Sequence, residues 1–224
     1  MIIKSRPMSP FFFKLAAALT GLVFKRKCKK LVIHPVELKS GHSYILMCNH
    51  YSFWDGFWAL YVCRKAFFRD GGMKKLYIMS VKKQMEKNRF LKYIGSFSVD
   101  PGKRSITESF DYAAEILSEP GNLLLFYPQG KLESAFIRYI KFDEGLYEIV
   151  TRINEKDNCQ LIWSSNIFEF YESFKPTITS YMLDCGSNHN FDFDTLKKNV
   201  NSFHLQSIKK QIRYTTEPEQ GMSL

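Results

Sequence analysis

The chain has 224 residues, of which 45% are hydrophobic and 24% charged, and its formal net charge is +10. This composition excludes extended disorder and suits one domain with a substantial core. The five cysteines are scattered and lack a C-x-x-C spacing, which argues against a disulfide framework or a structural metal site and favours a reducing compartment. The positive charge indicates an anionic partner, such as nucleic acid, anionic lipid or a phosphorylated substrate.

The N-terminal segment combines an apolar run with basic residues. The first 36 residues contain eight Lys or Arg and no acidic residue, and the apolar run extends from Phe11 to Phe24. This run is too short to cross a bilayer as a helix, which takes roughly 20 residues. A signal peptide is disfavoured because basic residues follow where a cleavage site should be, whereas such a cluster suits anionic headgroups. The cluster consists of Lys25, Arg26, Lys27, Lys29 and Lys30.

We therefore expect residues 1–30 to form an amphipathic, basic segment that associates peripherally with the cytoplasmic face of a membrane. The alternative is an amphipathic helix that packs on the domain and leaves its charged end in solvent. Nucleic acid is a weaker candidate partner, because no zinc-finger, RNA-recognition or helix-turn-helix signature is present and the Lys and Arg residues concentrate beside the apolar run.

Apolar, β-prone runs alternate with helical patterns through residues 31–214. This alternation predicts a single α/β domain with a mostly parallel central sheet flanked by helices. Residues 215–224 are expected to form a flexible tail. The predicted strands are 44–48, 76–80, 96–99, 123–127, 160–164 and 179–183, and the predicted helices are 54–64, 81–93, 106–117, 146–154 and 196–213.

The first of these strands ends directly before Asn49 and His50, and Asp55 follows in the first turn of the next helix. Active groups in open α/β sheets lie beyond the carboxyl ends of strands. A carboxylate at this spacing can fold back on the imidazole, fix its tautomer and leave the other ring nitrogen as a general base. The nucleophile can then be a hydroxyl of the substrate. Alternatively, Ser52 and Asp55 have capping-box spacing, and Asp55 only satisfies backbone donors at the helix start.

Three further blocks accompany this pair in chain order. Residues 95–100 read G-S-F-S-V-D, residues 126–134 read F-Y-P-Q-G-K-L-E-S, and residues 142–145 read F-D-E-G. With the N-H-x-x-x-x-D pattern of residues 49–55, these blocks resemble the glycerolipid acyltransferases typified by 1-acylglycerol-3-phosphate acyltransferase, over roughly residues 30–185. The resemblance implies phospholipid biosynthesis by direct transfer of a fatty acyl group from acyl-CoA or acyl-carrier protein to a lyso-lipid hydroxyl, with His50 as base, Asp55 orienting it, and no cofactor or metal.

The resemblance also implies that the second and third blocks hold the phosphate of the acceptor. The chain departs from the family pattern there: Pro101 replaces an Arg, Gln129 replaces a Glu, and Leu132 replaces another Arg. Lysine supplies charge nearby but lacks the bidentate fork of arginine, and Gln129 carries no charge. A lysophosphatidate-like acceptor is the first expectation; a lyso-aminolipid, another hydroxylated lipid, or an inactive lipid-binding relative are the alternatives. The candidate substrate-binding residues are Asn49, Lys103, Arg104, Gln129, Gly130 and Lys131.

Two further groups of residues have a less specific pattern. The histidines outside the motif, including His204, have no partner at a telling spacing and are expected on the surface or in loops. Aromatic residues are dense around the start of the helix predicted at 54–64, where they could line an acyl channel or simply pack the helix on the sheet. These aromatics are Tyr51, Phe53, Trp54, Phe57, Trp58 and Tyr61.

Overall fold

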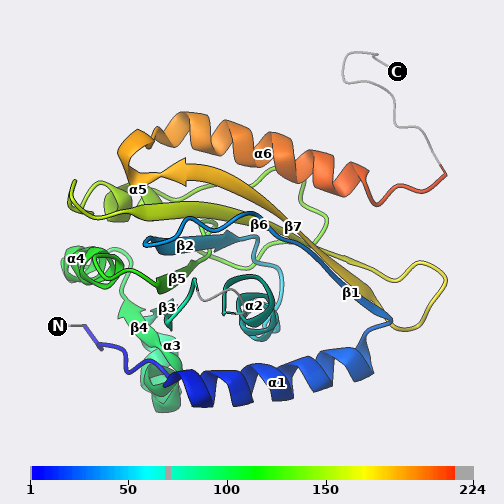
Figure 1. The fold of residues 1–224 in the computed structure, drawn as a ribbon, viewed down its shortest axis with the longest axis horizontal. Helices are drawn as coiled ribbons and strands as arrows, with labels where there is room; N and C mark the ends of the chain where they lie inside the picture. The colour runs from blue at the N-terminus through cyan, green and yellow to red at the C-terminus, as the bar shows by residue number, and fades with distance from the viewer. Residues whose placement is uncertain (1, 69–71, 215–224) are drawn as a thin grey trace.

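A seven-stranded sheet with helices on both faces organises the chain, as a computed structural model of the protein shows (Figure 1). The structure describes residues 2–68 and 72–214, so the tail predicted at 215–224 lies outside the described residues. The strands are β1 (Lys30–His34), β2 (Ser43–Cys48), β3 (Lys75–Val81), β4 (Ser96–Val99), β5 (Asn122–Phe126), β6 (Cys159–Glu169) and β7 (Thr177–Ser187). The α-helices are α1 (Pro10–Lys27), α2 (Asp55–Val62), α3 (Lys82–Lys87), α4 (Ile106–Leu117), α5 (Gly145–Val150) and α6 (Phe193–Lys209).

The strand order is β1-β7-β6-β2-β5-β3-β4, and every neighbouring pair is parallel except β6 and β7. The predicted α/β class with a mostly parallel sheet is therefore confirmed. Strands β2 to β6 run in one direction, while β1 and β7 run in the other. The carboxyl ends of β2, β5, β3 and β4 consequently share one edge of the sheet, where the residues of the motif blocks emerge.

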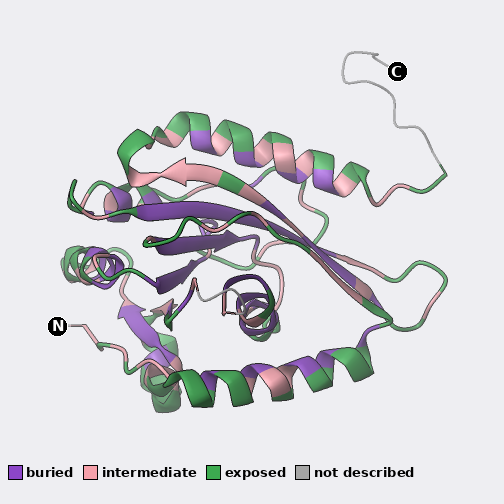
Figure 2. Ribbon diagram, viewed as in Figure 1, coloured by how far each residue is buried: buried purple, intermediate pink, exposed green. Residues whose placement is uncertain are grey.

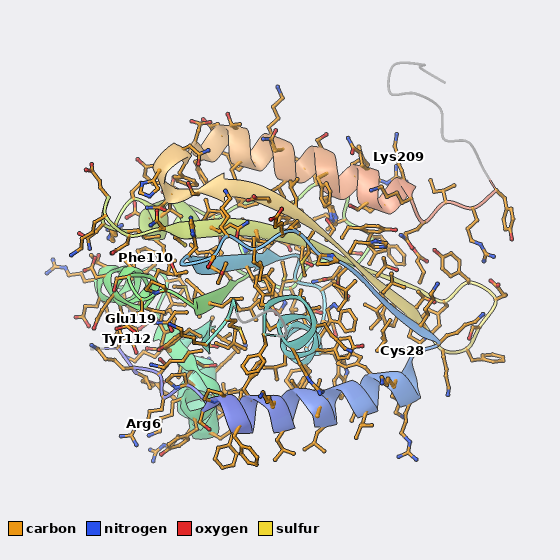
Figure 3. The ribbon with its side chains drawn as sticks, in the orientation of Figure 1. Arg6, Cys28, Phe110, Tyr112, Glu119 and Lys209 are labelled. Carbon is orange, nitrogen blue, oxygen red and sulfur yellow. The ribbon has the colours of Figure 1, made fainter. Side chains whose placement is uncertain are left out.

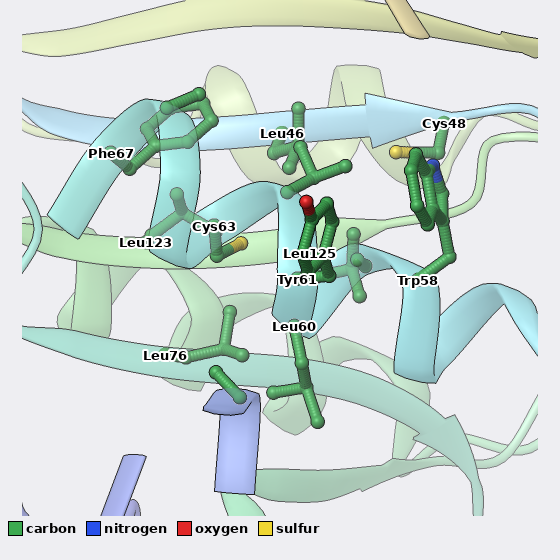
Figure 4. Packing of buried hydrophobic residues seen from close by; sticks show 14 of the residues in the cluster. Leu46, Cys48, Trp58, Leu60, Tyr61, Cys63, Phe67, Leu76, Leu123 and Leu125 are labelled. Atoms are coloured by element: carbon green, nitrogen blue, oxygen red, sulfur yellow. The ribbon is translucent and has the colours of Figure 1, made fainter. Parts of the chain in front are cut away.

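Two apolar layers enclose the sheet, and side chains fill the space on both faces (Figure 3). One layer contains α1, α2 and the π-helical turn that follows α2, η1 (Cys63–Phe68), against alternate residues of the central strands. Figure 4 shows part of this layer, in which Leu46 of β2 and Leu125 of β5 lie in the same cluster as Trp58 and Tyr61 of α2. The other layer contains α4, α5 and α6. Burial on both faces explains why the central strands read as continuous apolar runs.

Several predicted elements differ from the observed ones. Strand β1 was not predicted, and β6 and β7 are each longer than predicted because their ends extend beyond the apolar runs. The single helix predicted at 81–93 is wrong. It is divided at Asn88, whose backbone is not helical, into α3 and a 3-10 turn, η2 (Arg89–Ile94). Asparagine competes for backbone hydrogen bonds and weakens helices, and only Met85 of α3 is buried, so little packing holds a longer helix together.

Helix α1 packs along α2 through a narrow stripe of small and aromatic side chains. Ser9 caps its N-terminus and Pro10 occupies the first turn, both favoured at helix starts. The buried positions are Phe13, Ala17, Gly21 and Phe24, and the face directed away from the sheet is exposed (Figure 2). That outer face is apolar too, with Phe11, Phe12, Leu15, Leu19, Leu22 and Val23 all exposed. None of the helices within residues 2–68 and 72–214 has the length and apolar character required to span a bilayer.

Candidate active site

His50 and Asp55 meet at the carboxyl end of β2. The His50 Nδ1 atom lies 2.9 Å from Asp55 Oδ2, and the carboxylate is nearly buried whereas 26% of the His50 side chain is exposed. An ionised carboxylate only accepts hydrogen bonds, so this contact favours the neutral tautomer that has its proton on Nδ1 and its lone pair on Nε2. The contact expected from the five-residue spacing is therefore present, with the ring in the tautomer that a base at Nε2 needs.

Asp55 also organises the backbone before α2. Its Oδ2 atom accepts hydrogen bonds from the backbone N–H groups of Tyr51 at 2.7 Å and Ser52 at 2.8 Å. The capping alternative is thus part of the same arrangement, because one carboxylate oxygen satisfies backbone donors and holds the imidazole. These donors fix the position of the oxygen, and a fixed oxygen in turn fixes the ring of His50.

The loop after β5 contacts His50 from the other side. The ring of Tyr127 stacks on the imidazole with a centroid separation of 4.3 Å. Gln129 Oε1 accepts the backbone N–H of His50 at 2.7 Å, and the His50 carbonyl accepts the N–H of Glu133 at 2.9 Å. His50 is therefore held by its ring, its backbone N–H and its backbone carbonyl. Gln129 Nε2 is buried and has no hydrogen-bond partner among the described residues.

Asn49 joins two strands at the same edge of the sheet. Its Nδ2 donates to the Asn166 carbonyl at 2.9 Å, and its Oδ1 accepts the Asn166 N–H at 2.8 Å. Only 3% of Asn49 is exposed. Asn49 was predicted to bind substrate, but its amide is already engaged with β6. The structure thus gives it a positioning contact, which fixes the end of β2 directly before His50.

The cysteine and the tyrosines nearest His50 remain protonated. Burial raises the pKa of the Cys48 thiol to about 12, more than a hydrogen bond with Asn166 lowers it. Burial, followed by the charge of Asp55, raises the pKa of Tyr51. Burial also raises the pKa of Tyr127. A thiolate is the reactive form of cysteine, so Cys48 is unsuited to act as a nucleophile, and the imidazole of His50 is left as the candidate base.

A pocket of about 220 Å³ lies at the loop after β5, whose residues Gln129 and Glu133 contact the backbone of His50. Gly130 has a φ of +68°, which is strained for any other residue, and a Cβ at this position would lie 2.2 Å from Asp143 Oδ2, so the Asp143 side chain would have to move. Lys131 forms an ion pair with Glu133 at 3.5 Å. The lining therefore contains two lysines and two carboxylates next to the buried amide of Gln129. It consists of Gln129, Gly130, Lys131, Glu133, Ile137, Lys141 and Asp143.

Helix α6 anchors the loop that forms this pocket. Asn201 makes two hydrogen bonds with the backbone of Ile140, and His204 Nε2 lies 3.1 Å from the Ile137 carbonyl. His204 Nδ1 lies 3.0 Å from Ser165 Oγ, and burial lowers the pKa of His204. The expectation of a surface histidine is wrong here, since only 1% of His204 is exposed. Another hollow, of about 320 Å³, lies between β7 and α6, away from His50.

Lys103 and Arg104 are exposed in the turn between β4 and α4. They share the sheet edge with His50, but β4 is three strands from β2, a separation of about 14 Å at about 4.8 Å per strand. Gln129 therefore contacts His50 directly, with Gly130 and Lys131 next to it in the same loop, whereas Lys103 and Arg104 follow a strand that is not a neighbour of β2.

Five residues that contact His50 or line the pocket were not predicted as site residues: Tyr127, Glu133, Ile137, Lys141 and Asp143. Tyr127 and Glu133 lie within the third block and Asp143 within the fourth, and their position after a strand was the available signal. Lys141 had no such signal. No group of three or more His, Cys, Asp or Glu side chains in the described part of the chain could hold a metal ion.

Comparisons with known proteins agree with this architecture. A family model described as Acyltransferase matches residues 29–162, more than half of the chain and the span that contains His50, Asp55 and Gly130. The crystal structure of the 1-acyl-sn-glycerophosphate (LPA) acyltransferase PlsC from Thermotoga maritima is similar in fold, with a TM-score of 0.59. The likeness covers 91% of this chain and 81% of that chain at 13% sequence identity. None of the curated protein sequences compared with the chain matches it.

Proposed function

Since the chain belongs to the acyltransferase family, we propose that it moves a fatty acyl group from the thioester of acyl-CoA or acyl-carrier protein to a hydroxyl of a lyso-lipid. Membership of this family supports the activity of an acyltransferase in lipid biosynthesis, which uses an acyl donor and a lipid acceptor. The identity of the donor, the identity of the acceptor and the roles of individual residues are part of our proposal. The observation that carries it is the contact of His50 Nδ1 with Asp55 Oδ2 at the carboxyl end of β2, which leaves Nε2 as a base.

In the proposed reaction, His50 Nε2 takes the proton of the acceptor hydroxyl while the oxygen attacks the thioester carbonyl carbon. The carbon–sulfur bond then breaks, the acyl group stays on the acceptor oxygen, and the leaving thiolate takes the proton from Nε2. Asp55 stabilises the imidazolium that exists between these proton transfers. The raised pKa of Cys48 supports direct transfer without an acyl intermediate on this cysteine.

The pocket beside His50 supports a charged acceptor headgroup. Lys131 and Lys141 can attract a phosphate, which supports a lysophosphatidate-like acceptor. Glu133 and Asp143 line the same pocket, and they favour a second candidate, a lyso-lipid whose headgroup also carries an amine. In either case Gln129 Nε2, which has no hydrogen-bond partner among the described residues, is available to donate to an oxygen of the lipid acceptor.

Peripheral association with the cytoplasmic face of a membrane is part of the proposal. One stripe of α1 packs on the domain, and its exposed face carries a second set of apolar side chains beside Lys14, which suits an environment more apolar than water. The basic residues in the last turn of α1, Lys25, Arg26 and Lys27, can contact anionic headgroups. Reversing their charge should release the protein from anionic vesicles, and added salt should weaken wild-type binding. Equal sedimentation of variant and wild type would remove this part of the proposal.

The acceptor is tested by incubating the protein with labelled acyl-CoA, and separately with labelled acyl-carrier protein, against a panel of lyso-phospholipids and lyso-aminolipids. Two pocket variants make the test specific. Lys141→Met should impair transfer to a phosphate-bearing acceptor more than Asp143→Asn, whereas an amine-bearing acceptor should show the reverse order. Strong preference for an uncharged acceptor would contradict the charged pocket, and absence of transfer from both donors would favour an inactive lipid-binding protein.

A further inference from the structure

Three aromatic residues at the start of α2 form an exposed group that packing does not explain. The exposed fractions are 77% for Phe53, 55% for Trp54 and 40% for Phe57. Their ring centroids lie 5.5 to 6.0 Å apart, so the side chains contact one another. We refer to Phe53, Trp54 and Phe57 as the α2 aromatic cluster.

Two other aromatics of this segment, Trp58 and Tyr61, have a different environment. Trp58 is 2% exposed and Tyr61 is 7% exposed, and both belong to the core beneath α1 (Figure 4). Packing on the sheet thus accounts for them, but not for the α2 aromatic cluster. A contiguous exposed apolar group of this kind marks a contact surface more often than scattered surface residues do.

The α2 aromatic cluster is rigidly connected to the candidate catalytic pair. Trp54 and Phe57 flank Asp55 in the sequence. The backbone N–H of Trp54 donates to Ser52 Oγ, and the Trp54 carbonyl accepts the N–H of Trp58 at the start of α2. A surface that binds these rings therefore lies within one helical turn of the carboxylate that holds His50.

The cluster also lies toward the basic end of α1. The rings of Phe24 and Trp58 are 5.3 Å apart, and those of Phe13 and Phe68 are also 5.3 Å apart, so α2 contacts the C-terminal part of α1 near its start and η1 contacts the N-terminal part. The start of α2 is consequently directed toward the C-terminal end of α1, where its last turn holds Lys25, Arg26 and Lys27. Exposed aromatic rings favour the interfacial region of a bilayer, and basic residues on the same part of the molecule favour anionic headgroups.

We propose that the α2 aromatic cluster enters the interfacial region of an anionic membrane and brings the site of His50 to the bilayer surface. This inference rests on the proposed membrane association but makes a separate claim, since α1 alone could hold the protein on the membrane. Phe and Trp side chains bind at this depth through their apolar rings, while the Trp indole N–H can meet the headgroup layer. An acceptor lipid could then reach His50 with its acyl chain still in the bilayer.

The tryptophans of the chain provide the direct test. Trp58 and Trp163 are 2% and 0% exposed, so a change in emission on lipid binding would come from Trp54. We would titrate the protein with vesicles of equal parts phosphatidylcholine and phosphatidylglycerol. The expected result is a shift of emission to shorter wavelength and quenching by phosphatidylcholine brominated on its acyl chains. Trp54→Phe should lose both signals.

Vesicle sedimentation gives the accompanying measure of affinity. Phe53→Ala and Trp54→Ala should each weaken binding to these vesicles by about tenfold, because each removes an exposed ring from the contact. Tyr147→Ala is the matched control: Tyr147 is 46% exposed but lies on α5, in the layer on the other face of the sheet. Circular dichroism would verify that every variant is folded.

Each other outcome overturns the inference in an identifiable way. If wild type sediments with vesicles while Trp54 emission and bromine quenching stay unchanged, the cluster is not inserted, although membrane association through α1 stands. If wild type does not sediment, the cluster inference and the proposed membrane association both fail. If light scattering without lipid shows a dimer that Phe53→Ala converts to a monomer, the cluster is an interface between two copies of the chain.

Discussion

Replacing Asp55 by Asn removes one charge from the site while keeping the size of the side chain. In the wild type, Asp55 Oδ2 lies 2.9 Å from His50 Nδ1 and accepts the N–H groups of Tyr51 and Ser52. The amide oxygen of Asn can still accept from these donors. What it lacks is the negative charge that stabilises the imidazolium during proton transfer.

The expected loss of acyl-transfer rate follows from the distance between Asp55 Oδ2 and His50 Nδ1. Two unit charges 2.9 Å apart attract by about 6 kcal/mol at an effective dielectric constant of about 20. Because 26% of the His50 side chain is exposed, solvent screens part of this energy, and we expect a loss of about 4 kcal/mol. That energy corresponds to an acyl-transfer rate about 10³-fold lower. Weaker backbone hydrogen bonds at Tyr51 and Ser52 should also lower the free energy of unfolding by about 1–2 kcal/mol.

The assay compares single-turnover acyl transfer by wild type, Asp55→Asn and a control, Ser52→Ala. The control removes the Ser52 Oγ that accepts the Trp54 N–H, so it weakens the start of α2 without changing a charge. If Asp55 acts on His50, only Asp55→Asn should lose about 10³-fold, measured at a temperature where circular dichroism shows both variants folded. Comparable rates for the two variants, within tenfold of wild type, would refute the argument and leave Asp55 as a helix cap.

Two further predictions concern the fold around the site. Gly95→Ala should lower the free energy of unfolding by about 2–4 kcal/mol in urea titrations, because Gly95 has a φ of +94° and an added Cβ would lie 2.2 Å from the Leu76 carbonyl oxygen. Gly102→Ala is the control, since Gly102 also has a positive φ but faces open space, and it should lower this free energy by only about 1 kcal/mol. Equal losses for the two variants would contradict the predicted clash at Gly95. Burial lowers the pKa of His204, so the unfolded chain binds the proton first and stability should fall as pH drops below about 6.5. His204→Gln should reduce the change in the free energy of unfolding between pH values of about 7.5 and 5.5. An unchanged pH dependence would contradict this role of His204.

The local parts of the site were predictable because the sequence places them together. A buried strand, a histidine at its end and a carboxylate five residues later can only meet in a few ways, and the observed contact of His50 with Asp55 is one of them. The mostly parallel sheet was predictable for a similar reason, since strands covered on both faces are continuously apolar.

Contacts between distant segments were not predictable in this way. Asn49 meets Asn166 across 117 residues and His204 meets Ile137 across 67, and no spacing within one sequence indicates such pairs. The antiparallel direction of β7 was also hidden, because an apolar run has the same composition in either direction. The exposure of the α2 aromatic cluster depends on how α1 covers α2, so composition could not separate Trp54 from Trp58.

The role of His50 is the central claim, and its most direct test is the acyl-transfer rate of purified His50→Ala. The measurement uses the donor and acceptor that give the highest wild-type activity in the lyso-lipid panel. The ring of His50 is partly exposed and its backbone bonds to Gln129 and Glu133 do not need the side chain, so the variant should fold. Loss of a positioned base predicts a rate about 10²–10⁴-fold lower. Near wild-type turnover by folded His50→Ala would contradict the account.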